Sequence, residues 1–193
     1  MSGLVVVIGA GALGSHLVLL ARNWEVELKV VDFDRVEQKN TLAQFHSRMG
    51  LRQNKAQALQ KALSGLFGRR LEAVPHRLTD DNAAALLGGA ALVLDCTDNA
   101  EARRVIQRQV QAEGTPCLHG ALSADGTFGR VIWDEHFTAD EEGEPGQATC
   151  EDGQQLPMFA LVAAQLAVAA QRFLDSDQQQ SFQISPSGII RLA

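Results

Sequence analysis

The stretch LVVVIGAGALG, residues 4–14, decides the fold of this 193-residue chain. Its first five residues are apolar and rich in valine, which is typical of a strand buried on both faces of a parallel sheet. Gly9, Gly11 and Gly14 follow in a G-x-G-x-x-G pattern that opens a helical stretch, and residues 27–31 predict a second strand. The sequence therefore predicts a βαβ unit whose first turn is rich in glycine.

Each glycine of such a turn has its own physical role. The first permits the tight turn, the second lets the backbone approach a phosphate, and the third allows close packing of helix on strand. The helix N-terminus adds partial positive charge. Asp32, at the end of the second strand, is placed to accept hydrogen bonds from ribose hydroxyls. Glycines that serve only a tight turn are the alternative, and the turn alone does not distinguish NAD from ATP.

Strand and helix patterns alternate along the rest of the chain. They predict strands at 71–74, 91–94, 115–121 and 128–133 (the last two paired around a turn at 124–126), helices at 54–66, 80–87 (capped by Thr79), 100–113 and from Pro157 onward, and a hairpin over 181–193 with Ser187-Gly188 at its tip. We therefore predict an α/β fold. It is a Rossmann-like, doubly wound, mainly parallel sheet with helices on both faces and a C-terminal antiparallel hairpin.

The length predicts a single domain over residues 1–193. Acidic residues, glycine and glutamine replace the apolar periodicity between about 134 and 155, which predicts a mobile acidic crossover loop. The simplest interpretation of this stretch is a solvated loop. A second interpretation is a guide for the basic C-terminal tail of a partner protein.

Composition excludes several classes of partner. The 17 Lys and Arg residues against 23 Asp and Glu give a net charge of −6, without the basic footprint that nucleic acid requires. The N-terminus lacks the pattern of a secretory signal. Residues 158–174 are apolar, but two glutamines and an arginine interrupt them, which indicates a packed core helix and no membrane span. Three scattered cysteines predict neither a disulfide framework nor structural zinc, so we expect a cytoplasmic protein.

Four further motifs accompany the glycine turn. They are Asp-x-Asp-x-Val-x-x-x-Asn at 32–40 with Gln44 close behind, Gly-x-x-x-x-Lys-Ala at 50–56, Cys-Thr-Asp-Asn at 96–99, and Thr149-Cys150 ahead of a long Ala/Leu helix. With these motifs in this order, the chain resembles the ThiF/MoeB superfamily over nearly its whole length. Members of that superfamily adenylate ubiquitin-like and sulfur-carrier proteins.

The resemblance implies an adenylyltransferase that uses ATP and Mg²⁺. Its substrate would be the C-terminal carboxylate of a small ubiquitin-like or sulfur-carrier protein, and it would act as a homodimer or heterodimer. The implied catalytic residues are Asp98, which would also hold Mg²⁺, Lys55 and Cys150. The implied nucleotide-binding residues are Gly9, Gly11, Ala12, Gly14, Asp32, Asp34, Asn40, Gln44 and Lys55.

The residue types fit this chemistry on physical grounds. A C-terminal carboxylate is already ionised at neutral pH, so its attack on a phosphate needs no general base. The obstacle is repulsion between anions, roughly 4 kcal/mol per pair of unit charges at 4 Å in an effective dielectric of about 20. Lys55 would supply a cation, and Asp98 would hold a metal ion. The alternatives are that Lys55 is a solvated helix residue and that Asp98 caps the following helix.

Three departures from the family pattern keep other functions open. Ala43 stands where an arginine usually precedes the glutamine, and only Arg48 and Arg52 lie near enough in sequence to replace it. The usual N-terminal helical extension and the zinc-binding Cys-x-x-Cys pairs are absent from the sequence. A catalytically impaired member that serves as a scaffold or partner subunit is therefore the second hypothesis. An NAD-dependent oxidoreductase, indicated by the glycine turn and Asp32 alone, is the third.

The cysteines and histidines complete the candidates. Cys150 occupies the position of a cysteine that accepts the activated acyl group in some family members, but its acidic neighbours disfavour the thiolate, so an unreactive loop cysteine stays open. Cys96 and Cys117 lie in strand contexts and are expected to be small buried hydrophobes. The five histidines show no metal-ligand spacing, and each is expected to be an ordinary surface or core residue.

Overall fold

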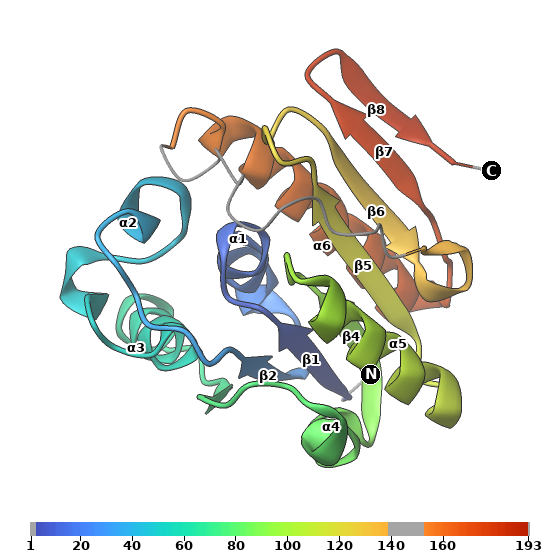
Figure 1. Ribbon diagram of the computed structural model, residues 1–193, viewed down its shortest axis with the longest axis horizontal. Coiled ribbons are helices and arrows are strands. Elements are labelled where there is room, and N and C mark those ends of the chain that lie inside the picture. Colours follow the sequence, from blue (N-terminus) through green and yellow to red (C-terminus); the bar gives the residue numbers. More distant parts are fainter. Residues whose placement is uncertain (1–2, 139–152, 193) are drawn as a thin grey trace.

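The computed structural model of the protein describes residues 3–138 and 153–192. Its centre is one eight-stranded sheet with the order β3-β2-β1-β4-β5-β6-β7-β8 (Figure 1). The strands from β3 to β5 run parallel, and those from β5 to β8 are antiparallel. The strand bounds are β1 Leu4–Ile8, β2 Glu27–Val31, β3 Glu72–Val74, β4 Ala90–Asp95, β5 Cys117–Leu122, β6 Gly129–Trp133, β7 Phe182–Ser185 and β8 Gly188–Arg191.

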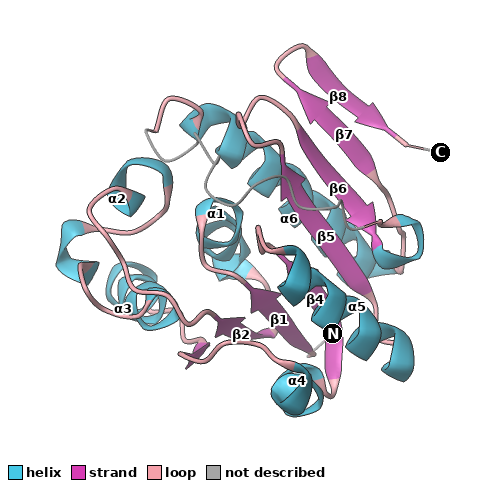
Figure 2. Ribbon diagram, in the orientation of Figure 1, coloured by secondary structure: helices cyan, strands magenta, loops and turns pink. Residues whose placement is uncertain are grey.

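Helices cover both faces of the sheet (Figure 2). One face carries α1 and α6, and the opposite face carries α4 and α5. The helix bounds are α1 Ala12–Leu20, α2 Asn40–Ala43, α3 Lys55–Phe67, α4 Asp80–Leu87, α5 Ala100–Glu113 and α6 Leu156–Ser176, with short 3-10 turns η1 Ala21–Asn23, η2 Arg48–Gly50 and η3 Asp134–His136. The predicted doubly wound fold with a C-terminal antiparallel hairpin is confirmed.

The central strand β1 is apolar because both of its faces are buried. Val5 and Val7 point into the apolar cluster shared with α1 and α6. Val6 and Ile8 point into the second cluster, shared with α4 and α5. All four side chains are at most 3% exposed, so this strand alternates between two cores rather than between core and solvent.

Local capping signals place the helix ends close to their predicted positions. The Asn54 side chain accepts a hydrogen bond from the Gln57 amide and starts α3. Thr79 forms a capping box with Asn82 at the start of α4, as the sequence predicts. Gly114 takes a left-handed conformation, with φ of 66°, and ends α5.

Helix α6 is the largest covering element. By length and composition alone it is apolar enough to cross a membrane. In the fold its residues Phe159, Val162 and Leu166 are fully buried, and α6 packs on α1 and the sheet, while Leu161 and Val168 are partly exposed. This burial is that of a core helix, which agrees with the interpretation from the sequence.

The first residue of the acidic stretch is more ordered and more buried than the sequence predicts. Asp134 was predicted to be the first residue of a solvated loop, but it lies in η3 and is only 9% exposed. The reason is a hydrogen bond with the buried His119, because tertiary contact overrides the composition of the segment. Most of the predicted crossover loop, together with Cys150, lies outside the described residues, and the single domain over 1–193 stays a prediction.

Candidate functional site

The glycine turn lies where the carboxyl ends of β1 and β4 meet. Gly9 has a φ of 91°, and a side chain there would approach the Cys96 carbonyl to 2.8 Å. At Gly14 a Cβ would lie 1.8 Å from the Gly9 carbonyl, so this position tolerates only glycine. The space above Gly11 is open to at least 4 Å. The turn therefore leaves room for a ligand at its second glycine and is closed by packing at the other two.

Asp32 fixes this turn to the end of β2. One carboxylate oxygen accepts the Ala10 amide at 2.6 Å, and the other accepts the Asp34 amide at 2.7 Å. Burial raises the pKa of Asp32, because desolvation outweighs these hydrogen bonds. Each oxygen retains a second lone pair, so the carboxylate has capacity left for ligand hydroxyls. Its predicted bond to ribose stays a prediction.

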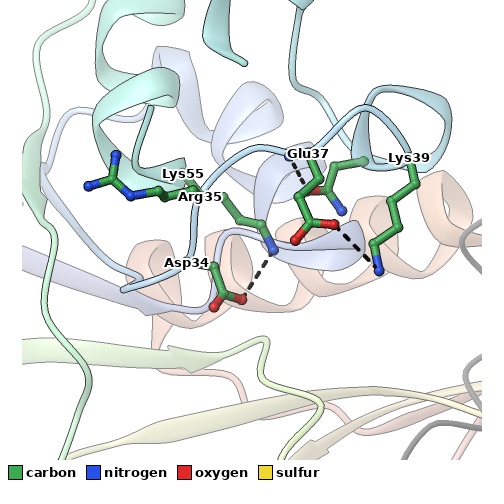
Figure 3. Close-up of a pocket in the computed structure, with 6 residues that line it drawn as sticks. Asp34, Arg35, Glu37, Lys39 and Lys55 are labelled. Carbon is green, nitrogen blue, oxygen red and sulfur yellow. Dashed lines mark hydrogen bonds and ion pairs between the residues drawn. The ribbon is translucent and has the colours of Figure 1, made fainter. Parts of the chain in front are cut away.

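A polar pocket of about 140 Å³ lies beside the segment that follows β2 (Figure 3). Lys55 begins α3, and its ammonium points to the Asp34 carboxylate at 3.3 Å. The Lys55 side chain is 10% exposed and that of Asp34 is 50% exposed. Lys55 is therefore a buried cation at a pocket wall, and its interpretation as a solvated helix residue is wrong. The pocket is lined by Asp34, Arg35, Glu37, Lys39, Asn40 and Lys55.

The loop between β2 and α2 gives this pocket its shape. The Asn40 side-chain oxygen accepts the Glu37 amide at 2.8 Å, and Asn40 is 4% exposed. Asn54 donates to the carbonyls of Asp32 and Asp34, at 2.7 and 3.1 Å. Lys55 also donates its amide to the Asp34 carbonyl at 2.8 Å. Three of the predicted site residues, Asp34, Asn40 and Lys55, are thus brought together.

Asp98 lies on the other side of β1. The Cys96 amide donates to the Ile8 carbonyl at 2.8 Å, so the turn after β4 lies against the glycine turn. Asp98 is exposed, and it is Asn99 whose side chain caps α5 by accepting the Ala102 amide. The alternative that Asp98 is the helix cap is therefore wrong.

The next question is whether the described residues fit the predicted Mg²⁺ ion. Within residues 3–138 and 153–192, no three His, Cys, Asp or Glu side chains are grouped to hold a metal ion. Mg²⁺ is usually bound through one or two carboxylates together with substrate phosphates and water. The single exposed carboxylate of Asp98 beside the glycine turn fits that mode. The carboxylate does not form a site on its own.

Ala43, at the position where the family pattern usually has an arginine, is the last residue of α2. Ala43 is 3% exposed, and within the described chain the buried side-chain oxygen of Gln44 has no hydrogen-bond partner. Arg48 and Arg52 do not line the pocket, but Arg35 does, and its guanidinium donates to the Arg52 carbonyl at 2.7 Å. The sequence interpretation did not select Arg35, which lines the pocket but turns its guanidinium away from Lys55 and Asp34 (Figure 3).

His46 also escaped the sequence interpretation. Its Nε2 lies 2.9 Å from the Ala10 carbonyl of the glycine turn. Because a carbonyl only accepts, Nε2 carries the proton. Burial lowers the pKa of His46 to about 4, so the ring is neutral at physiological pH and braces the turn. The one signal for this contact in the sequence is that His46 lies two residues after Gln44, a predicted site residue.

The described cysteines are buried, as predicted. Cys96 is 8% exposed and Cys117 is 2% exposed. Burial raises the pKa of both thiols, that of Cys117 to about 11, so both stay protonated near neutral pH. The predicted acceptor Cys150 lies outside the described residues.

The chain is similar to several curated proteins. The sulfur carrier protein adenylyltransferase of Thermus thermophilus is 36% identical over 121 residues, which cover 61% of this chain and 45% of that protein. The molybdopterin-synthase adenylyltransferase of Salmonella typhimurium is 33% identical over 61% of this chain and 48% of its own length. The SAMP-activating enzyme E1 of Haloferax volcanii is 34% identical over 63% of this chain and 46% of its own length. The chain thus aligns with less than half the length of these relatives.

Solved structures share the fold at lower identity. The crystal structure of E. coli MccB with MccA-N7isoASN has a TM-score of 0.79 and 16% identity, covering 98% of this chain and 63% of that chain. PaaA has a TM-score of 0.76 and 14% identity, covering 98% of this chain and 62% of that chain. The model of the ThiF family matches residues 2–186. By this match over nearly its whole length, the chain belongs to the ThiF family.

Proposed function

We propose that this chain adenylates the C-terminal carboxylate of a small ubiquitin-like or sulfur-carrier protein, using ATP. Family membership and the adenylyltransferase names of its curated relatives support the proposal. The observation that carries it is the buried ammonium of Lys55 at the wall of a polar pocket. Through Asp34 and Asp32, that pocket is linked to the backbone of the glycine turn.

The proposed reaction joins two anions. An oxygen of the carrier carboxylate attacks the α-phosphorus of ATP, a bond from carboxylate oxygen to phosphorus forms, and the α–β anhydride bond breaks to release pyrophosphate. The carboxylate needs no proton removed, so the protein has to hold the reactants and offset their charge. Lys55 is a cation at the pocket, and the backbone around Gly11 is open to a phosphate.

A magnesium ion would supply further positive charge to the departing pyrophosphate. Asp98 would hold it from the β4 side, opposite Lys55 on the β2 side. Asp32 would bind the ribose, with Asn40 and Gln44 completing the polar wall. These assignments follow the family pattern and are part of the proposal.

The proposal has three further parts. The activated acyl group passes from the adenylate to the thiol of Cys150, and AMP leaves. The protein acts as a homodimer or heterodimer, which rests on the family resemblance. It works in the cytoplasm, which rests on the small number of scattered cysteines in the sequence.

Lys55→Ala tests the proposal against a matched control, Lys61→Ala. Lys61 lies on the same helix, is exposed, and donates to Gln53. The assay is exchange of labelled pyrophosphate into ATP, with the ubiquitin-like and sulfur-carrier proteins encoded nearest to this gene. We expect Lys55→Ala to lower exchange tenfold or more, because charge-assisted hydrogen bonds contribute about 1.5–3 kcal/mol. Equal exchange in the two variants would reject the assigned site.

The two other hypotheses predict different outcomes. A catalytically impaired scaffold, indicated by the buried Ala43, would bind ATP and a carrier without exchanging pyrophosphate. An NAD-dependent oxidoreductase would be stabilised against heat by NADH and not by ATP with Mg²⁺. Thermal shifts with the two nucleotides therefore separate the third hypothesis from the first two, and the exchange assay separates the first from the second.

A further inference from the structure

A buried histidine on β5 lies between two carboxylates. His119 Nδ1 is 2.7 Å from an oxygen of Asp95, and Nε2 is 2.9 Å from an oxygen of Asp134. His119 and Asp95 are at most 1% exposed. The contacts join β4, β5 and η3, which are 15 to 24 residues apart in sequence. Neither the proposed reaction nor the family motifs quoted above account for this cluster.

The geometry sets the charge of the ring. An ionised carboxylate oxygen only accepts hydrogen bonds, so both ring nitrogens must carry protons, and His119 is an imidazolium. Burial disfavours the charged ring, but the hydrogen bonds to Asp134 and Asp95 outweigh it and raise the pKa of His119 to about 11. The same bonds help to hold the pKa of both carboxyls below the usual range, although burial opposes this.

At the Asp95 end, the cluster holds the turn that bears Asp98 in place. The second oxygen of Asp95 accepts the Thr97 amide at 2.9 Å and the Thr97 hydroxyl at 2.7 Å. Arg103 donates to the Thr97 carbonyl at 2.6 Å from the opposite side, and its Nε lies 3.8 Å from Asp95. Thr97 is thus held on both sides, and Asp98 is the next residue of the chain.

The other end holds the segment that follows β6. Gln107 and Gln111 of α5 donate to the two oxygens of Asp134, at 3.1 and 2.8 Å. The Phe137 ring stacks on the His119 ring, with centroids 4.0 Å apart and planes 6° from parallel. Gln107 also donates to the Phe137 carbonyl at 3.3 Å. Residues 134–137 are therefore fastened to the same imidazolium that orients Asp95.

We propose that His119 is a positioning residue that couples residues 134–138 to the Asp98 turn, so that loosening either segment loosens the other. The coupling itself depends only on these contacts. Its consequence for the reaction rests on the proposed function, because only there does Asp98 act. In that reaction, loss of the link misplaces Asp98 and lowers turnover while the ATP contacts of Lys55 and Asp32 remain.

Hydrogen exchange of the nucleotide-free protein tests the coupling. Asp134→Ala cuts only the far end of the cluster, yet we expect exchange to rise about tenfold or more at residues 96–99 as well as at 134–138. His136→Asn is the control, because His136 is an exposed residue of the same short helix. It should change neither segment. A rise confined to 134–138 in Asp134→Ala would overturn the proposal.

Asp134→Ala could unfold the whole domain, and fast hydrogen exchange at β1 would reveal this. A second, milder variant is therefore needed. Asp134→Asn keeps an oxygen that accepts from His119 but removes one charge, so we expect a smaller rise at both segments. A rise at 134–138 alone would again reject the coupling. The ring nitrogens are read by NMR at pH 8.5, where both nitrogens of His119 should carry protons. A neutral His119 would refute the imidazolium.

Kinetics then separate this inference from the proposed function. In pyrophosphate exchange with the carriers named above, His119→Asn should lower kcat tenfold or more and leave the KM for ATP within about twofold of the wild type. A raised KM at unchanged kcat would contradict the role assigned to His119. If the wild-type protein exchanges no pyrophosphate, the proposed function fails, and the hydrogen-exchange result still decides the coupling.

Discussion

Replacing His119 by asparagine should change how the stability of the protein depends on pH. The folded pKa of His119 is about 11, against an ordinary value of 6.5. Because the folded value is the higher one, the stabilisation is complete below about pH 6.5 and is lost as pH rises toward about 11. Between these limits the free energy of unfolding falls by about 1.4 kcal/mol per pH unit. From pH 7.0 to 8.5 the wild-type protein should therefore lose about 2 kcal/mol through this group.

Other groups that titrate in this range are controlled by the comparison with His119→Asn. The groups that face His119 are Asp95, Asp134, Arg103 and the Cys117 thiol, which lies 3.6 Å from Nε2. Asp95 and Asp134 have lowered pKa values and change only in acid. The pKa of Cys117 is about 11, so its contribution lies above pH 8.5. The variant keeps all four groups and lacks only the imidazole.

Urea denaturation at several pH values measures the effect. At pH 7 the variant should be less stable by about 3–5 kcal/mol, since it leaves two buried carboxylates without their cation. The variant has no imidazolium to lose with rising pH, so the two curves should converge between pH 7.0 and 8.5. The corresponding shift in wild-type Tm is roughly 4–8 °C for a domain of this size. Parallel curves for the two proteins would refute a buried imidazolium at this position.

Three predictions concern the nucleotide site and its chemistry. Asp32→Ala should weaken ATP binding in titration calorimetry by about tenfold or more, because it removes a carboxylate with capacity for ribose hydroxyls; unchanged affinity would count against that role. Asp98→Ala should abolish pyrophosphate exchange with an unchanged circular dichroism spectrum, and wild-type exchange would exclude the metal role. Cys150→Ser should still exchange pyrophosphate but form no reducible conjugate with the carrier on non-reducing gels. A reducible band that persists in this variant would direct attention to Cys117 or Cys96.

Local patterns explain why most of the fold could be predicted. The valine run of β1 and the glycine turn follow one another directly, and at Gly14 a side chain would meet the nearby Gly9 carbonyl. Helix starts were read from single caps, such as Thr79 before α4. The pairing of β5 with β6 follows from a turn signal at Gly126, whose φ is 69°. Each of these signals involves residues that are close together in the sequence, so it can be recognised without knowledge of the tertiary structure.

The His119 cluster could not be predicted, because it depends on strand register. Asp95 and His119 are register partners in the parallel pair of β4 and β5. His119 pairs with Ile132 across β6, and Asp134 follows two residues later. Residues 117–120 of β5 are buried on both faces, so no alternation of apolar and polar residues specifies the alignment. The histidine was therefore expected to be an ordinary core or surface residue, and Asp134 was assigned to a solvated loop.

The same limit applies to the burial of Lys55. Its position at the start of a helix is typical of an exposed residue, and its place at the pocket depends on the backbone of 32–34. The family resemblance, and not its local environment in the sequence, is what selected Lys55 as a site candidate. Arg35 had no such support and was missed, although it lines the same pocket.

The two charged clusters beside β1 differ in what a ligand can do to them. Asp34 is half exposed, so its attraction to Lys55 is screened and contributes at most about 1 kcal/mol. A polyphosphate with several negative charges can take this lysine from its partner at little cost. The imidazolium of His119 is fully buried between two carboxylates, and displacing it would leave buried charges uncompensated at about 3–5 kcal/mol. Lys55 can therefore exchange its partner for a ligand at the pocket. His119 cannot, and it holds the backbone segment that carries Asp98.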